Sequence, residues 1–212
     1  MAILEELSDA VQTGNRKSVT ELTQQAIDEG IDVKTILDEG LINAMTIIGD
    51  KFSRNEVFVP EMLVAARAMT AGTEVLKPYL IESGSEPLGH AVIGTVKGDM
   101  HDIGKNLVRM MIEGKGIEVA DMGVDVSPET FVEHVKANSD CGLVCLSALL
   151  TTTLPMISET IKAIEEAGVR DQVKVMIGGA PVSGAFAEEV GADAYTPDAG
   201  SAATKAADLV TA

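Results

Sequence analysis

The sequence is poor in aromatic, basic and sulfhydryl side chains, and each shortage excludes a class of function. Aromatic residues make up 3% of the 212 residues and tryptophan is absent, so there is no stacking platform for nucleic acid bases. Lys and Arg number 16 against 33 Asp and Glu, a net charge of −17, whereas nucleic acid and anionic membranes both require a basic face. Two cysteines cannot form a disulfide framework, which favours a reducing, cytoplasmic compartment.

Long apolar runs are also missing. The longest, around Cys141 to Leu150, is too short to cross a bilayer, and the start MAILEELSDAV lacks the basic and apolar regions of a signal peptide. At 46% hydrophobic residues, however, the chain has enough apolar surface to fold around a core. We therefore expect a folded protein with no nucleic acid and no membrane partner.

The composition divides the chain in two. Residues 77–90 (KPYLIESGSEPLGH) interrupt all periodicity with Pro, Gly and Ser, which indicates a linker. We place the first domain at 1–82, the linker at 83–89 and the second domain at 90–212. Apolar residues before the linker recur at helical spacing in four runs, which begin near Ile3, Val19, Ile36 and Pro60. Four helices with short connections predict an all-α four-helix bundle.

The second domain alternates between short β-branched runs and segments of helical period. The predicted strands are 91–96, 117–123, 142–149, 173–179 and 192–196, and the predicted helices are 104–115, 128–137, 155–168, 181–190 and 199–210. Such alternation predicts a five-stranded, doubly wound parallel sheet of the flavodoxin-like (Rossmann-like) α/β class. Ligands bind such sheets beyond the carboxyl ends of the strands.

The densest polar cluster follows the first of these strands. In Lys97-Gly98-Asp99-Met100-His101-Asp102, a carboxylate stands two residues before a histidine, where it can accept the imidazole N–H and raise the basicity of the other ring nitrogen. That arrangement orients a metal-bound histidine, although an ordinary surface hydrogen bond would give the same pattern. Asp102 is well placed as the N-cap of the next helix.

Two more loops are expected at the same edge of the sheet. Thr151, Thr152 and Thr153 follow the third strand, and one hydroxyl could bond Asp99; a threonine-rich helix start is the alternative. Gly178-Gly179 ends the fourth strand and either admits a bulky ligand or makes a tight turn. The dinucleotide fingerprint, the P-loop and the G-x-S-x-G elbow are all absent. Cys141 and Cys145 are expected to be buried, and His90 and His134 to be structural or solvated.

Taken together, Asp99-x-His101-x-x-Gly104, Ser147-x-Leu149 and Gly178-Gly179 resemble the signature of cobalamin-binding domains that hold the cofactor "base-off, His-on". The helical half, with Ile48-Gly49-Asp50-Lys51-Phe52 and Val57-Phe58-Val59-Pro60, is similar to the helical cap of methionine synthase and of methanogen and acetogen corrinoid proteins. The resemblance covers essentially the whole chain.

The resemblance implies a role for each matching residue. His101 would be the lower axial ligand of cobalt, Asp99 its hydrogen-bond partner, and Thr153 the hydroxyl that methionine synthase supplies with serine. Phe52 and Val59 would shield the upper, methyl-bearing face, where Val59 is smaller than the usual leucine. The remaining cofactor-binding residues would be Asp102, Ile103, Gly104, Ser147, Leu149, Thr151, Gly178, Gly179, Tyr195, Thr196 and Ala199.

The function implied is that of a corrinoid methyl carrier with no turnover alone. Its cofactor would be cobalamin or a related corrinoid in the methylcobalamin form, cycling between Co(I) and methyl-Co(III). The partners implied are a substrate-specific methyltransferase, a corrinoid:acceptor methyltransferase with a folate or thiol acceptor, and a reductive activator. A mutase subunit usually lacks this helical cap, and a cobalamin-sensing regulator needs a basic DNA-binding domain. The methyl donor (a methylamine, a quaternary amine, methanol or an aryl methyl ether) stays open.

Overall fold

The computed structural model describes residues 2–83 and 86–211. The chain divides between Glu86 and Pro87 into two compact units, here called the helical unit and the α/β unit. The described part of the helical unit has helices and no strand, and the α/β unit contains a parallel five-stranded sheet. The predicted fold class is thereby confirmed. Within the described residues, no helix is both long enough and apolar enough to span a bilayer.

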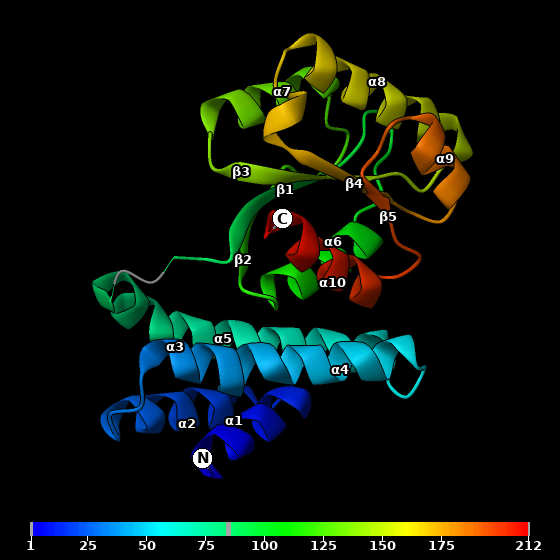
Figure 1. Cartoon of the computed structure of the whole chain (residues 1–212). Helices are drawn as coiled ribbons and strands as arrows, with labels where there is room; N and C mark the ends of the chain where they lie inside the picture. Colours follow the sequence, from blue (N-terminus) through cyan, green and yellow to red (C-terminus); the bar gives the residue numbers. More distant parts are fainter. Residues whose placement is uncertain (1, 84–85, 212) are drawn as a thin grey trace. The chain divides into compact units, whose positions relative to one another are not determined.

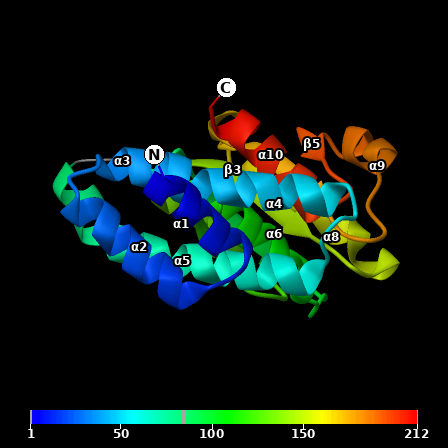
Figure 2. The same cartoon turned by 90° about the horizontal axis from the view of Figure 1, so that it is seen from below.

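The helical unit follows the four predicted apolar runs, with one irregularity. Helices α1, α2 and α5 lie side by side (Figure 2). The third predicted helix is built from three consecutive sections, the middle one a π-helical segment, η1, whose wider turns the apolar spacing does not reveal. The elements are α1 (Ala2–Gln12), α2 (Arg16–Asp28), α3 (Val33–Thr35), η1 (Ile36–Ile42), α4 (Asn43–Ser53) and α5 (Val59–Ser83).

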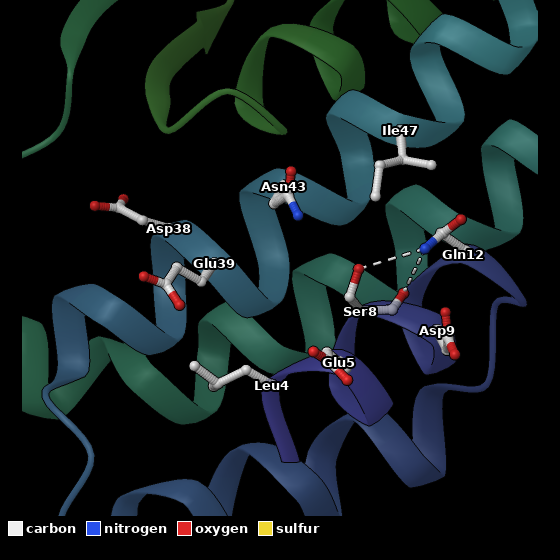
Figure 3. A pocket seen from close by; sticks show the side chains of 9 residues that line it. All are labelled: Leu4, Glu5, Ser8, Asp9, Gln12, Asp38, Glu39, Asn43 and Ile47. Atoms are coloured by element: carbon white, nitrogen blue, oxygen red, sulfur yellow. Dashed lines mark hydrogen bonds between the residues drawn. The ribbon is translucent and has the colours of Figure 1, made fainter. Parts of the chain in front are cut away.

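The π-helical segment borders a groove of about 560 Å³ against α1 (Figure 3). Its lining includes two apolar side chains, Leu4 and Ile47, and four carboxylates. None of the site residues predicted from the sequence lies in this groove. Its lining residues are Leu4, Glu5, Ser8, Asp9, Gln12, Asp38, Glu39, Asn43 and Ile47.

The region expected to be a linker is shorter than its composition indicates. Helix α5 continues through Pro78 to Ser83, although proline removes one main-chain hydrogen bond from the helix interior. Leu76, two residues earlier, is fully buried, and this packing sustains the helix where propensity alone would end it. At the other end Gly89 begins the first strand. Within the predicted linker, Gly84 and Ser85 lie outside the described residues.

The α/β unit contains five parallel strands in the order β2-β1-β3-β4-β5, which is the doubly wound flavodoxin-like order. Helices α6 and α10 lie on one face of the sheet and α7 and α8 on the other (Figure 1). The strands are β1 (Gly89–Thr95), β2 (Ile117–Asp121), β3 (Cys141–Ser147), β4 (Lys174–Gly178) and β5 (Ala194–Tyr195). The helices are α6 (Ile103–Glu113), α7 (Pro128–Ala137), α8 (Leu154–Glu166), α9 (Gly184–Glu189) and α10 (Ala199–Val210), with short 3-10 turns η2 (Thr151–Thr153) and η3 (Arg170–Gln172).

The sheet brings the three predicted loops together. Strands β1, β3 and β4 are consecutive neighbours, with Thr95 beside Ser147 and Ser147 beside Gly178 in the register. Because the strands are parallel, the loops that follow them leave from one edge. The direction of winding changes between β1 and β3, so the loops after β1 and β3 lie at the switch point, where such sheets bind ligands.

Candidate cofactor site

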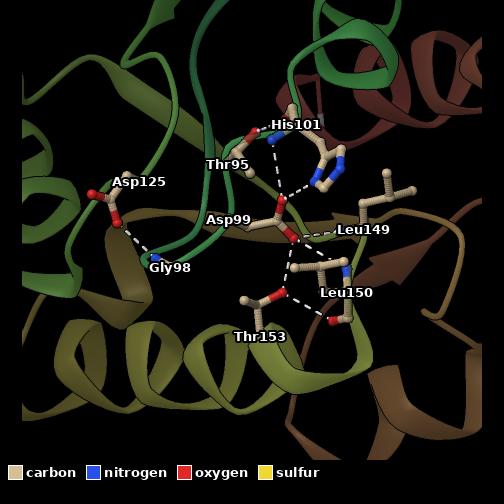
Figure 4. Close-up of polar contacts among 8 residues, drawn as sticks. All are labelled: Thr95, Gly98, Asp99, His101, Asp125, Leu149, Leu150 and Thr153. Atoms are coloured by element: carbon tan, nitrogen blue, oxygen red, sulfur yellow. Dashed lines mark hydrogen bonds and ion pairs between the residues drawn. The ribbon is translucent and has the colours of Figure 1, made fainter.

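A buried carboxylate organises the loop between β1 and α6 (Figure 4). The Asp99 side chain has no exposed surface. Its Oδ1 accepts hydrogen bonds from the His101 main-chain N–H (3.1 Å) and from the His101 ring (2.6 Å). Its Oδ2 accepts from the main-chain N–H groups of Leu149 (2.7 Å) and Leu150 (3.1 Å) and from the Thr153 hydroxyl (2.8 Å). The carboxylate therefore ties the loop after β1 to the loop after β3.

The hydrogen bond from His101 to Asp99 fixes which ring nitrogen is available. It uses Nδ1, and because an ionised carboxylate can only accept, Nδ1 carries the proton. In the neutral ring the lone pair is then on Nε2, which has no hydrogen-bond partner within residues 2–83 and 86–211. The side chain is 51% exposed. An oriented Nε2 with an available lone pair on a half-exposed side chain is the donor atom that a single protein ligand to a metal must offer.

Asp99 remains ionised despite its burial. Burial opposes ionisation, but the hydrogen bonds from the His101 ring, the Leu149 main chain and the Thr153 hydroxyl outweigh it and hold the pKa of Asp99 well below its ordinary value. The Thr153 hydroxyl also lies 2.9 Å from the Leu150 carbonyl oxygen. Since a hydroxyl has one proton and the carboxylate is the stronger acceptor, the bond to Asp99 is favoured. Hydroxyl, carboxylate and imidazole thus form a continuous chain.

Asp102 occupies the predicted N-cap position of α6, but its side chain makes no capping hydrogen bond. The carboxylate accepts instead from the Asn106 side chain (3.2 Å), which draws it along the outside of the helix. The first turn of α6 is secured through the Asp102 carbonyl, which accepts from the Asn106 main chain (2.8 Å).

The two glycines after β4 differ in what they require. Gly179 has φ of +127°, and a Cβ there would overlap the Ala148 carbonyl oxygen, so the contact between the β3 and β4 loops demands glycine. A Cβ at Gly178 would meet no atom within 4 Å, and the same holds for Gly104 on α6. Close packing within the protein therefore requires glycine at position 179, whereas there is open space beside Gly178 and Gly104.

The other predicted residues divide between the two units. Ser147 and Tyr195 end β3 and β5, Thr151 begins η2, and Thr196 lies between β5 and α10. Ala199 begins α10 and is buried. In the helical unit, Phe52 is half-buried on α4, and Val59 is the first residue of α5 and is exposed.

An apolar rim around His101 was only partly foreseen. Ile103 is 79% exposed, Met100 is 68% exposed, and Leu149 and Leu150 are each exposed by about two fifths. Leu149 and Ile103 were predicted as site residues, whereas Met100 and Leu150 were not. Exposed apolar side chains on the loops that hold a polar group are typical of a binding site for a large, mostly apolar ligand.

The remaining histidines and the cysteines are arranged differently. His90, at the amino end of β1, lies 3.6 Å from Glu118 and 3.5 Å from Asp140, away from the three loops. His134 is on α7. Cys141 and Cys145 are free thiols, and burial raises the pKa of both. Among the described residues, no cluster of three or more His, Cys, Asp or Glu side chains could hold a metal ion by itself.

Comparison with known proteins identifies the class to which this fold and site belong. Two family profiles, both described as a B12 binding domain, match residues 89–207 and residues 3–77. The chain therefore belongs to the family of B12-binding proteins, and its cofactor is cobalamin or a related corrinoid. The site fits that group: His101 presents one free ring nitrogen, apolar side chains surround it, and Gly104 and Gly178 leave space.

Similar proteins narrow the class to the corrinoid proteins of methyltransferase systems. Dimethylamine corrinoid protein 1 of Methanosarcina acetivorans is 44% identical over 210 residues, which cover 98% of this chain and 97% of that protein. A cobalamin-binding protein from Desulfitobacterium hafniense has a solved structure that matches with a TM-score of 0.81 at 30% identity, over 97% of this chain and 98% of that one. A chain of the methanol:cobalamin methyltransferase complex from Methanosarcina barkeri matches with a TM-score of 0.87 at 27% identity, over 99% of this chain and 80% of that one.

Proposed function

We propose that this protein is a methyl carrier that binds its corrinoid base-off, with Nε2 of His101 as the lower axial ligand of cobalt. The observation that supports this best is the geometry at His101. A fully buried carboxylate holds Nδ1 at 2.6 Å and leaves Nε2 accessible within a rim of exposed apolar side chains. When bound, the corrinoid supplies a cobalt atom that accepts a methyl group from one reactant and donates it to another.

The chain's own residues orient the ligand and make room for it. Asp99 and Thr153 set the tautomer and direction of His101. Glycine at positions 104 and 178 leaves space for the displaced nucleotide tail, and Tyr195, Thr196 and Ala199 close that slot. Main-chain and hydroxyl groups line it as well, from Asp102, Ile103, Ser147, Leu149, Thr151 and Gly179.

The helical unit supplies the shield for the methyl-bearing face. Phe52 and Val59 are the residues that carry this role, and Phe58, which is 64% exposed beside Val59, extends the apolar surface. A methyl group on cobalt must be screened from water and stray nucleophiles, which an apolar cover achieves. This shield must also move aside, because each methyltransferase must reach the shielded face.

The partners follow from the carrier role. A substrate methyltransferase loads the methyl group, a second methyltransferase passes it to a folate or thiol acceptor, and a reductive activator restores oxidised cobalt. The names of the relatives include dimethylamine and monomethylamine corrinoid proteins, which favours a methylamine as methyl donor.

Substitution of His101 tests the axial ligand. The His101→Ala protein should retain corrinoid more weakly than the wild type, because the nucleotide slot remains while the ligand is lost. Its Co(II) form should lose the nitrogen splitting in the electron paramagnetic resonance spectrum that an axial imidazole produces. His134→Ala, which removes a histidine on α7, is the matched control and should behave as the wild type. An unchanged spectrum for His101→Ala would exclude His101 as the ligand.

A further inference from the structure

The loop between β2 and α7 contains a residue in an unusual conformation next to the site. Asp125 has φ of +55°, in the left-handed region that non-glycine residues seldom occupy. Such conformations persist only where the surroundings impose them, and they concentrate at functional sites. Asp125 is 24 residues beyond His101 in the sequence and belongs to none of the three motifs that define the site.

Two hydrogen bonds join Asp125 to the residues that begin the site loop, and Figure 4 shows the one to Gly98. Its Oδ1 accepts from the Gly98 main-chain N–H at 2.7 Å. Its own main-chain N–H donates to the Asp99 carbonyl oxygen at 3.0 Å. The Asp99 N–H donates to the Val96 carbonyl oxygen (3.1 Å), so both main-chain polar groups of Asp99 are hydrogen-bonded. These bonds fix the main chain of Asp99 and thereby the direction in which its side chain leaves it.

Asp125 is itself fixed by the sheet. Gly123, two residues before Asp125, and Val126, directly after it, both bond to Thr95 of β1: the Thr95 N–H donates to the Gly123 carbonyl (3.0 Å), and the Val126 N–H donates to the Thr95 carbonyl (2.9 Å). The Thr95 hydroxyl in turn donates to the His101 carbonyl (2.8 Å). The positive φ of Asp125 is what turns both its N–H and its carboxylate toward the loop while the neighbouring residues stay paired.

We propose that Asp125 is a positioning residue that aligns Asp99 and, through it, the His101 ring for ligation. The part that concerns ligation rests on the proposed function, whereas the alignment of the Asp99–His101 pair does not. The competing explanation is an exposed turn residue without influence on the site, because aspartate tolerates positive φ better than most residues.

Three substitutions separate these explanations. Asp125→Gly removes the acceptor for Gly98 but accommodates the positive φ, so the fold is retained. Asp125→Asn keeps both an acceptor oxygen and tolerance of positive φ, and it is the matched control. Asp125→Ala removes the acceptor and adds strain, so a defect common to the Gly and Ala proteins reports the lost hydrogen bond.

The first measurement uses the protein without corrinoid. The hydrogen-bonded Nδ1 proton of His101, assigned by its absence from the His101→Ala spectrum, should be a downfield nuclear magnetic resonance signal in the wild type and in Asp125→Asn. In Asp125→Gly this signal should broaden or disappear. The second measurement is the Co(II) spectrum of the cobalamin-loaded protein, in which Asp125→Gly should show about a tenfold weaker axial ligation.

The outcomes are distinct. A His101 proton signal in Asp125→Gly identical to that of the wild type would overturn the proposal, as would a Gly protein that no longer folds, since Asp125 would then serve the fold. Loss of the signal in Asp125→Asn as well would also contradict it. If His101→Ala retained the nitrogen splitting, the axial-ligand assignment would fail, while the corrinoid-free signal would still decide the role of Asp125.

Discussion

A single buried side chain, Asp99, determines the geometry at the centre of the site. Five hydrogen bonds converge on its two oxygens, three of them from main-chain N–H groups. Main-chain donors in the loops after β1 and β3 cannot rotate away as side chains do, so the carboxylate has one orientation. That orientation is transmitted to His101 and decides which ring nitrogen faces outward.

At Gly179 we predict that even the smallest side chain destabilises the protein. Gly179→Ala would place a Cβ against the Ala148 carbonyl oxygen at a φ that alanine avoids. The free energy of unfolding should fall by more than about 3 kcal/mol, which urea denaturation followed by circular dichroism would measure.

Gly178→Ala is the matched control for that experiment. Its Cβ would meet no atom within 4 Å, so the free energy of unfolding should change by less than about 1 kcal/mol. Under the proposed function it should nevertheless weaken corrinoid binding, measured by visible absorbance. Equal stability losses for the two substitutions would show that the contact with Ala148 is not what requires Gly179.

Sequence reasoning identified the Asp99–His101 pair but not all the hydrogen-bond partners of Asp99. The pair was visible because its side-chain chemistry and its position after a strand can be read from the sequence, whereas Thr153 was singled out among the three threonines only by the resemblance. Every residue except proline has a main-chain N–H, so nothing in the sequence indicates that those of Leu149 and Leu150 donate to Asp99. The absence of a capping bond from the Asp102 side chain has a related reason. An N-cap aspartate has other possible partners, and here its carboxylate accepts a hydrogen bond from the Asn106 side chain.

Among the secondary-structure elements, α6 is attached to β2 by a buried charge. The Lys105 ammonium is 2.6 Å from Asp121 and 2.8 Å from the Asn106 side-chain oxygen, and only 1% of its side chain is exposed. Burial opposes ionisation of Asp121, but the hydrogen bonds from Lys105 and from the Gly123 N–H lower its pKa below the ordinary value. Lysine is usually a surface residue, so the helical period alone could not predict this pair.

Removal of this charge should destabilise the protein in a pH-dependent manner. Lys105→Met leaves Asp121 without its main partner, and because Asp121 is partly exposed we expect a loss of about 2 kcal/mol at pH 7. A carboxylate with a lowered pKa stabilises the fold above its unfolded-state pKa, about 4, and this contribution is lost as the pH falls. The difference in the free energy of unfolding between the wild type and Lys105→Met, measured by urea denaturation, should therefore narrow below about pH 4.

Lys162→Met provides the comparison for that measurement. Lys162 pairs with Glu166 on α8 at 3.5 Å, but both side chains are largely exposed, so the loss should be under about 0.5 kcal/mol. If Lys105→Met were as stable as Lys162→Met, the buried pair would not be a source of stability. The same conclusion would follow if the difference in the free energy of unfolding between the wild type and Lys105→Met widened in acid.

Element boundaries were predictable to within a few residues wherever an apolar pattern ended at a strong signal. Ser127-Pro128 begins α7 at the expected residue, with the Ser127 hydroxyl accepting from Thr130. The sequence did not reveal η1 or the continuation of α5 through Pro78, because both depend on packing between helices. Gly40, for example, lies where a Cβ would come within 2.6 Å of a Leu7 methyl carbon on α1.

For the molecule as a whole, charge is the dominant long-range term. The excess of 17 acidic residues gives a self-repulsion that several exposed ion pairs offset only weakly, since each is worth a fraction of a kcal/mol. Salt screens repulsion over distances beyond about 10 Å at 0.1 M. Stability should therefore increase with ionic strength, although the individual pairs weaken.

We predict that the midpoint of thermal unfolding rises by about 5 °C between 20 mM and 500 mM salt. Differential scanning calorimetry in NaCl and in KCl would measure it, and screening should give the same rise in both. A rise confined to one cation would indicate specific ion binding, and a fall would show that attractive pairs outweigh the net charge.

The short edge strand β5 has a consequence for motion. Only Ala194 and Tyr195 pair with β4, whereas β1 and β3 are each paired on both sides. Local unfolding begins where the fewest hydrogen bonds must break, so amide hydrogens at this edge exchange before those of the central strands. Under the proposed function, the residues from Tyr195 onward that close the nucleotide slot should therefore open and reclose more often than Asp99 and Thr153, which lie in the loops after the central strands.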